Sequence, residues 1–139
     1  MVHALEEIHR TLVPAGLLID LRPVADRWPV EVVEGQIYHS TGRLTDLPAG
    51  LADDQAANNA IMEAARRGWF RREIKQNFPF FFYWDAPEEM KGYILDKWSE
   101  FILLEDSLYT RTQDTWKVFG PNAPIRVKRK MLLAHWRKH

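Results

Sequence analysis

The sequence lacks cysteine, net charge and any long apolar run, and each absence excludes a class of protein. Without cysteine, the 139 residues hold no disulfide framework and no thiolate metal site, as is usual in a reducing compartment. The 19 basic side chains balance 19 acidic ones, so no global field attracts nucleic acid or acidic lipid. No apolar run approaches the roughly 20 residues that cross a bilayer, and no signal peptide is evident. We therefore expect a cytoplasmic protein with neither nucleic acid nor a membrane as partner.

Clustered glycines and clustered metal ligands are missing as well. The seven glycines are scattered, no two of them lie within four residues of each other, and no Gly-x-Gly exists. A loop that cradles a nucleotide-like cofactor needs glycines together at a strand-helix turn, because the backbone must approach the ligand closely. The five histidines show no metal-ligand spacing, and no Gly-x-Ser-x-Gly elbow is present. We expect this chain to contain no cofactor-binding residues and no metal site.

What is present is typical of one globular domain over residues 1–139, since 46% of the residues are hydrophobic and six are tryptophan. Apolar residues at helical spacing predict a first amphipathic helix that Pro14 stops. Further patterns predict an Ala-rich helix that begins near Asp53 or Asp54 and ends at Gly68. A third helix starts at Asp85-Ala86-Pro87-Glu88, with an aspartate cap and Glu88 reaching back, and extends to about residue 104. A fourth covers 106–118.

The strand predictions begin with 17–21, which is apolar on both faces, as expected for a buried parallel strand covered on both sides. Residues 30–44 read as a β-hairpin around Glu34-Gly35. In the strand 74–84, Ile74, Phe78, Phe80, Phe82 and Trp84 alternate onto one face and predict a core surface. Pro79 assigns this strand to a sheet edge, because proline cannot donate to a ladder on its second side. The last strand, 125–136, is then expected inside the sheet.

The stretch "ALEEIHRTLVPAGLLIDLRP", residues 4–23, resembles the C-terminal half of a class I S-adenosylmethionine-dependent methyltransferase. That family has a helix rich in Leu, Glu and Arg, a Leu-x-Pro-Gly-Gly turn and an apolar fifth strand. Here the turn is Leu12-Val13-Pro14-Ala15-Gly16, and we expect Gly16 to supply the permissive backbone position. The family's sixth strand lies at the sheet edge, and its seventh runs antiparallel between the fifth and sixth. The resemblance implies a truncated Rossmann-like α/β fold with a short mixed sheet, an inserted hairpin and helices on the faces in three layers.

The same resemblance implies a methyltransferase-related protein that corresponds to the substrate-side half and lacks the N-terminal cofactor-binding half. We expect it to be inactive alone and to bind no S-adenosylmethionine unless that half is supplied. Nothing in the sequence provides the fourth strand that would pair beside 17–21. This exposed edge is expected to recruit a second copy, giving a homodimer, or a complementing chain. Two alternatives are a non-catalytic interaction module and a small α+β domain that binds a ligand in a pocket lined by Tyr38, Trp84, Tyr93 and Trp98.

Candidate site residues lie at the end of the first strand, on the hairpin and near the third helix. Asp20 and Arg22 end a strand where α/β folds place functional groups, so they are candidate substrate contacts; the alternative is an ion pair between neighbours. The other substrate-side candidates are Tyr38, His39, Trp84, Tyr93 and Trp98, while no catalytic residue is identified. The basic stripe Arg126, Lys128, Arg129 and Lys130 is interpreted as a solvated strand end.

Overall fold

The computed structural model describes all 139 residues and divides into two compact units. The terminal unit comprises residues 1–24, 52–78 and 131–139, and the hairpin unit comprises residues 25–51 and 79–130. The two longest strands and one helix contribute residues to both units. The expectation of one domain over 1–139 stays a prediction.

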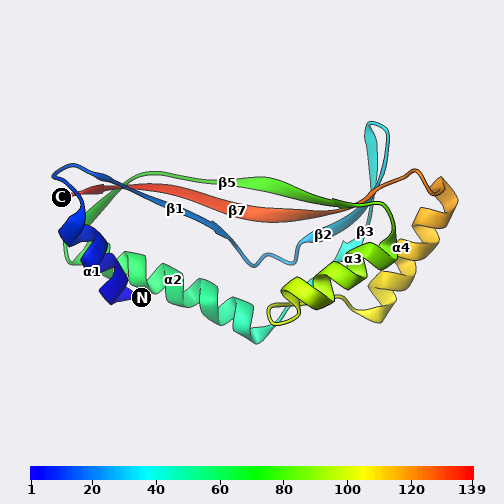
Figure 1. The fold of residues 1–139 in the computed structure, drawn as a ribbon, viewed down its shortest axis with the longest axis horizontal. Helices are drawn as coiled ribbons and strands as arrows, with labels where there is room; N and C mark the ends of the chain where they lie inside the picture. The colour runs from blue at the N-terminus through cyan, green and yellow to red at the C-terminus, as the bar shows by residue number, and fades with distance from the viewer. The chain divides into compact units, whose positions relative to one another are not determined.

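The terminal unit places an antiparallel strand between two strands of the same direction (Figure 1). Its elements are α1 (Val2–Thr11), β1 (Leu17–Pro23), most of α2 (Pro48–Arg66), the start of β5 (Phe70–Trp84) and the end of β7 (Ile125–Lys138). Strand β1 pairs antiparallel with β7 from Leu17 opposite Arg137 to Pro23 opposite Met131. Strand β5 pairs only with β7. Both predictions about the sheet are therefore confirmed: Pro79 lies in an edge strand, and the last strand is inside.

The direction of β5 follows from contacts at its two ends. Near its start, Glu73 binds Arg137, and near its end, Tyr83 accepts a hydrogen bond from Arg126. Residue numbers thus rise along β5 as they fall along β7, so the two strands are antiparallel. Since β1 is also antiparallel to β7, β1 and β5 run in the same direction.

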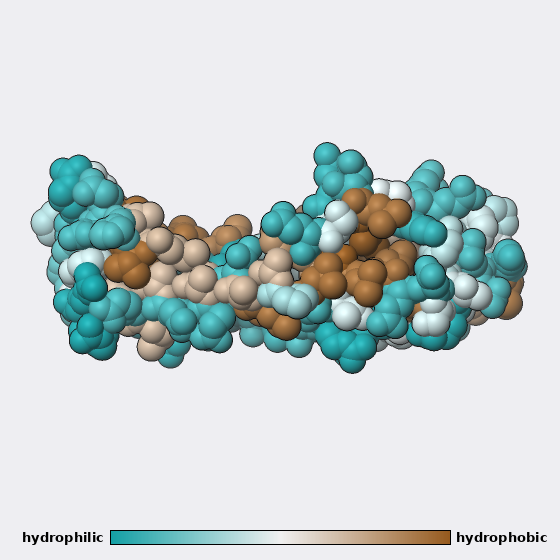
Figure 2. Space-filling model, turned by 90° about the horizontal axis from the view of Figure 1, so that it is seen from below, coloured by the Kyte–Doolittle hydropathy of each residue, from teal (hydrophilic) through white to brown (hydrophobic).

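Both helices of the terminal unit pack on one face of its strands (Figure 1). Leu5 and Ile8 of α1, Leu12 directly after it, and Ile61 and Ala64 of α2 pack with Phe70, Ala134 and Trp136. The buried alanines of α2, Ala60 and Ala64, are small and let this helix lie close to the strands, while other alanines contribute to the pale brown band on its outer side (Figure 2). On the opposite face of β1, Leu17, Ile19 and Leu21 are 38%, 54% and 57% exposed. The expected strand covered on both sides, and with it the three-layer arrangement, is wrong in this unit.

The hairpin unit contains four further strands and three helical segments. Its elements are β2 (Pro29–Glu34), β3 (Ile37–Arg43), β4 (Thr45–Asp46), α3 (Pro87–Tyr93), the π-helical turn η1 (Ile94–Trp98), β6 (Ile102–Leu103) and α4 (Asp106–Phe119). The predicted hairpin is confirmed, with its turn at Gly35, whose φ is +59°. Strand β2 also pairs with the start of β7, and β4 pairs with β6.

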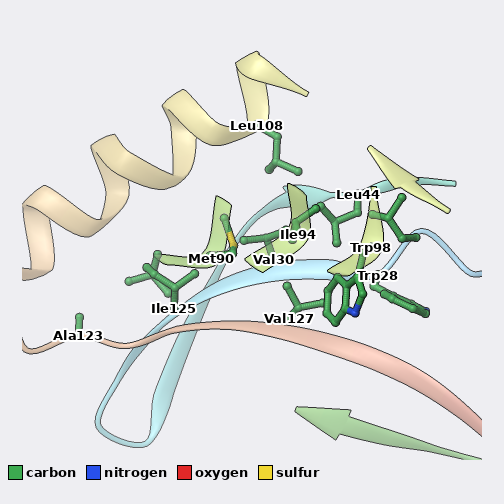
Figure 3. Close-up of a cluster of buried hydrophobic side chains, with 12 residues drawn as sticks. Trp28, Val30, Leu44, Met90, Ile94, Trp98, Leu108, Ala123, Ile125 and Val127 are labelled. Carbon is green, nitrogen blue, oxygen red and sulfur yellow. The ribbon is translucent and has the colours of Figure 1, made fainter. Parts of the chain in front are cut away.

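The core of this unit lies between the hairpin, the start of β7 and the helices (Figure 3). Met90, Ile94 and Trp98 follow one another along α3 and η1 and point at Val30 and Val127. Leu108 of α4 and Leu44 close the same cluster. Beside it, the buried hydroxyls of Thr41 and Thr112 are 2.8 Å apart and share one hydrogen bond. In Figure 2, darker brown side chains gather over α3 and η1, where Leu95 is exposed.

Two helix boundaries differ from the prediction for local reasons. Helix α2 starts at Pro48 rather than at Asp53 or Asp54, because proline is suited to a first helical turn and Leu47 is held by the Phe101 carbonyl. Helix α3 is capped by Ala86 rather than Asp85, and it is Glu89, not Glu88, that accepts the Asp85 N–H at 3.0 Å.

The helical segment that follows ends at Trp98 rather than near residue 104. Ile102 lies beyond this end and pairs with Asp46 in the short β4–β6 ladder, so the helix cannot extend to residue 104.

The strand predicted over 74–84 begins four residues earlier, at Phe70, and is covered only in part. Ile74 and Phe80 are 48% and 52% exposed, so the prediction that they share a core face is wrong. Only Phe82 and Trp84 pack against the hairpin-unit core, because Tyr93 and Trp98 reach them there. The helix predicted over 106–118 is confirmed within one residue.

The turn before β1 places its strain on alanine rather than on glycine. Ala15 has a φ of +61°, a left-handed conformation that disfavours residues with a Cβ. Gly16 is required for a different reason, since a Cβ there would lie 2.8 Å from the Val13 carbonyl oxygen. The expectation that Gly16 supplies the permissive conformation is therefore wrong: Ala15 has to adopt it.

We expect Ala15→Gly to raise the free energy of unfolding by about 1 kcal/mol, because glycine adopts the left-handed conformation without the Cβ clash. The matched control is Ala56→Gly, the same chemical change on an exposed position inside α2. It should lower the stability by about 1 kcal/mol, because glycine is a poor helix residue. Urea unfolding followed by circular dichroism measures both. A loss of stability in Ala15→Gly would contradict the strain at this turn.

Candidate functional site

Strand β1 pairs with β7 along one edge and has no partner strand along the other. In register with the ladder, the Lys138 N–H donates to the Gly16 carbonyl at 2.9 Å. Hydrogen-bonded pairs alternate with non-hydrogen-bonded pairs in an antiparallel ladder. The N–H and C=O groups of Leu17, Ile19 and Leu21 therefore point away from β7. We call these outward groups the β1 edge. The same three residues also have exposed apolar side chains.

The alternate residues of β1 face the helices and form a polar cluster. The Arg22 Nε donates to Asp20 Oδ1 at 3.1 Å, and its Nη2 donates to Asn58 Oδ1 of α2 at 2.6 Å. The two charged side chains are only 17% and 20% exposed. The ion-pair alternative is thus confirmed for Asp20 and Arg22. Their role as substrate contacts stays a prediction.

In the hairpin unit, Tyr38 belongs to a network around Arg126. The Arg126 Nε donates to Glu31 Oε1 at 2.7 Å, and its Nη1 donates to the Tyr83 hydroxyl at 3.3 Å. The guanidinium also lies 5.0 Å from the Tyr38 ring centroid and 4.4 Å from that of Phe81. Burial lowers the pKa of Arg126, but the hydrogen bonds to Tyr83 and Glu31 outweigh it and raise the pKa. This arginine has its counter-charge within the chain.

His39 is separate from Tyr38, because successive side chains of a strand point to opposite faces. Its ring stacks on Phe119 with the centroids 4.2 Å apart, and its Nε2 lies 3.8 Å from Glu34 Oε2. The structure therefore does not bring the two hairpin candidates into one site.

Trp84, Tyr93 and Trp98 do come together, with Trp28 and Phe82, in an aromatic cluster defined by these five rings. The ring centroids of Tyr93 and Trp98 are 5.4 Å apart and their ring planes are nearly perpendicular. Trp28 and Trp98 pack in the same way, also with centroids 5.4 Å apart. Trp84 lies 5.5 Å from Tyr93. Edge-to-face packing of this kind is favourable for aromatic rings. Of the four side chains expected to line a ligand pocket, three meet here and Tyr38 does not.

Three rings of the aromatic cluster lie against Arg129, which the sequence pattern assigned to a solvated stripe. Its guanidinium carbon lies 5.1 Å from the Trp28 centroid, 5.5 Å from Phe82 and 5.7 Å from Trp98. Burial lowers the pKa of the Arg129 guanidinium. Only Lys128 of the stripe is fully exposed. Alternation was the missed signal, since Arg126 and Arg129 lie on opposite faces of β7 and each meets one face of the aromatic strand β5.

No three histidine, aspartate or glutamate side chains are placed to hold a metal ion. No helix has the length and hydropathy that a bilayer span requires. Comparison of the chain with protein families, with curated proteins and with solved structures found no match. The candidate sites therefore rest on their own geometry.

We expect the 139-residue chain to dimerise through the β1 edge and Ile19→Pro to make it monomeric. The Ile19 N–H points outward, so proline removes a donor of the free edge without removing a ladder bond to β7. Ile19→Ala is the matched control, because it shortens the same side chain and keeps the N–H. Light scattering at high concentration measures the mass. A wild-type monomer near 16.3 kDa would contradict the dimer.

Proposed function

We propose that residues 1–139 form the substrate-side half of a class I S-adenosylmethionine-dependent methyltransferase. The half becomes active when a cofactor half, on the same polypeptide or on another, completes its sheet. One observation carries this proposal: β7 runs antiparallel between β1 and β5, which share one direction. The family that residues 4–23 resemble arranges its fifth, seventh and sixth strands in this way.

The connections support the same interpretation. Helix α1 leads through a tight turn into β1, and α2 lies in the connection from β1 to β5. Two strands of one direction need a long crossover of this kind, whereas neighbouring antiparallel strands do not. The β2–β3 hairpin is then an insertion in that crossover.

The β1 edge supports the proposal because the fifth strand of the parent fold is interior. Leu17, Ile19 and Leu21 present unpaired backbone groups and exposed apolar side chains. A fourth strand laid along β1 would satisfy these groups and cover part of that face. Natural sheet edges are usually interrupted by lysine, proline or a bulge, and within 17–21 the β1 ladder is regular.

The residues of this chain do not fit the cofactor by themselves. S-adenosylmethionine, which supplies the methyl group, is held in this class by a glycine-rich loop and an acidic strand end. This chain has no such loop, since no two of its glycines lie within four residues of each other and β1 corresponds to the fifth strand of that fold rather than to the first. The carboxylate of Asp20 at the β1 end is engaged by Arg22. What this half contributes is the acceptor side, with Arg22 at that strand end and Asn58 of α2, which accepts its hydrogen bond, as candidate polar groups.

A second candidate is a non-catalytic interaction module, and the same edge favours it. A strand-pairing surface functions without any cofactor, by adding a strand from a partner. The two candidates differ in whether completing the sheet creates a cofactor site.

The isolated chain should show no binding of S-adenosylmethionine in calorimetric titration, because it has neither the glycine loop nor a free acidic strand end. Micromolar binding would contradict the proposal that the cofactor half is separate.

A chimera tests the proposal directly. It joins the first four strands and their helices, taken from a class I methyltransferase of known structure, to Met1 of this chain. We expect a monomer that binds S-adenosylmethionine about tenfold more tightly than the added half alone, because a completed sheet fixes the cofactor loop. Ile19→Pro should abolish the gain and Ile19→Ala should keep it. A folded chimera that still dimerises without any gain would favour the interaction module.

A further inference from the structure

Arg129 is a partly buried cation for which the chain provides no counter-charge. Its Nε is buried and has no hydrogen-bond partner, and no carboxylate lies within ion-pair distance of the guanidinium. The rings of Trp28, Phe82 and Trp98 are its neighbours. A charge removed from water normally has a paired group, so this arrangement calls for an explanation.

Arg126, three residues earlier on the same strand, shows what a completed site looks like. It too lies against aromatic rings, but Glu31 and Tyr83 bind its guanidinium. The charged side chains next to Arg129 in the sequence are cations and cannot neutralise it. Lys128 is exposed, and Lys130 binds Asp26 at 3.3 Å. The Tyr93 hydroxyl makes no hydrogen bond with Arg129.

The open part of the guanidinium is its Nη end. Of the three nitrogens, only Nε is fully buried without a partner, and neither Nη donates a hydrogen bond to the chain, so both Nη groups have donors left for a ligand. They form the fork that binds a planar carboxylate or a phosphate through two hydrogen bonds. Trp84 and Tyr93 belong to the same aromatic cluster, where they lie against Phe82 and Trp98, and both are only partly buried, so they have ring surface free for a ligand.

We propose that Arg129 and the aromatic cluster bind a small organic oxyanion, a carboxylate or phosphate carried on an aromatic body. The oxyanion binds the Nη groups of Arg129, and the attached ring packs on Trp84 and Tyr93. Aromatic clusters also bind organic cations, but Arg129 already places a positive charge among these rings and repels a second one. The site lies wholly in the hairpin unit and does not depend on the proposed function, which the terminal unit carries.

Four probes separate the two parts of the ligand: acetate, benzoate, inorganic phosphate and phenyl phosphate, at constant ionic strength. Proton-nitrogen NMR follows the Arg129 Nε–H and the indole N–H groups of Trp28, Trp84 and Trp98 during each titration. We expect saturable shifts of these signals, with the ring-bearing anion of each pair binding about fivefold more tightly than its ring-free partner. Whichever of benzoate and phenyl phosphate binds more tightly identifies the headgroup. Equal affinities with and without the ring would overturn the aromatic part of the proposal.

Arg129→Gln should abolish the saturable shifts, whereas Lys128→Gln, which removes the same charge from an exposed neighbour on β7, should leave them unchanged. If Arg129→Gln does not fold, Arg129→Lys takes its place and should weaken binding about tenfold, because an ammonium lacks the fork. The proposal is overturned if no probe gives a saturable shift in the wild type. Binding that survives at Arg129→Gln or disappears at Lys128→Gln would equally overturn it, as adventitious binding to the surface lysines.

Discussion

The backbone hydrogen bonding of β7 is the constraint on which both units depend. In the terminal unit this strand pairs with β1 on one edge and with β5 on the other, and in the hairpin unit its start pairs with β2. Where β7 is paired on both edges, its N–H and C=O groups are satisfied, so the side chains there can be buried without leaving backbone groups unpaired. Ile125, Val127, Ala134 and Trp136 accordingly lie in the two cores.

The same strand also explains why two arginines behave so differently. Alternation sends Arg126 to the face where Glu31 and Tyr83 bind it and Arg129 to the face of the aromatic cluster. Cation–π contact compensates a guanidinium only in part for lost water. Arg126 is therefore paired within the chain, whereas Arg129 has hydrogen-bond donors left for the proposed ligand.

Patterns that depend on neighbours in the chain were readable from the sequence. The hairpin turn at Gly35, the helix ending at Gly68 and the edge position of the proline strand all follow from local backbone rules. Whether a second layer of structure covers a strand could not be predicted from the sequence. Leu17, Ile19 and Leu21 belong to an apolar run that is typical of a buried strand, yet their side chains are exposed. For the site, the grouping of Trp84, Tyr93 and Trp98 was predictable. The place of Arg129 beside them depended on the register between distant strands, which no local pattern encodes.

The two outer edges of the terminal unit are unequal, and this inequality limits how far assembly can proceed. Along the β1 edge the outward N–H and C=O groups follow a regular pattern as far as Pro23, which has no N–H. Beyond β5, the opposite edge carries Arg71, Arg72, Glu73 and Lys75, all exposed. Charges of this density oppose the addition of another strand. A strand added at β1 thus meets no matching edge on the far side, and growth stops after one addition instead of continuing into a fibre.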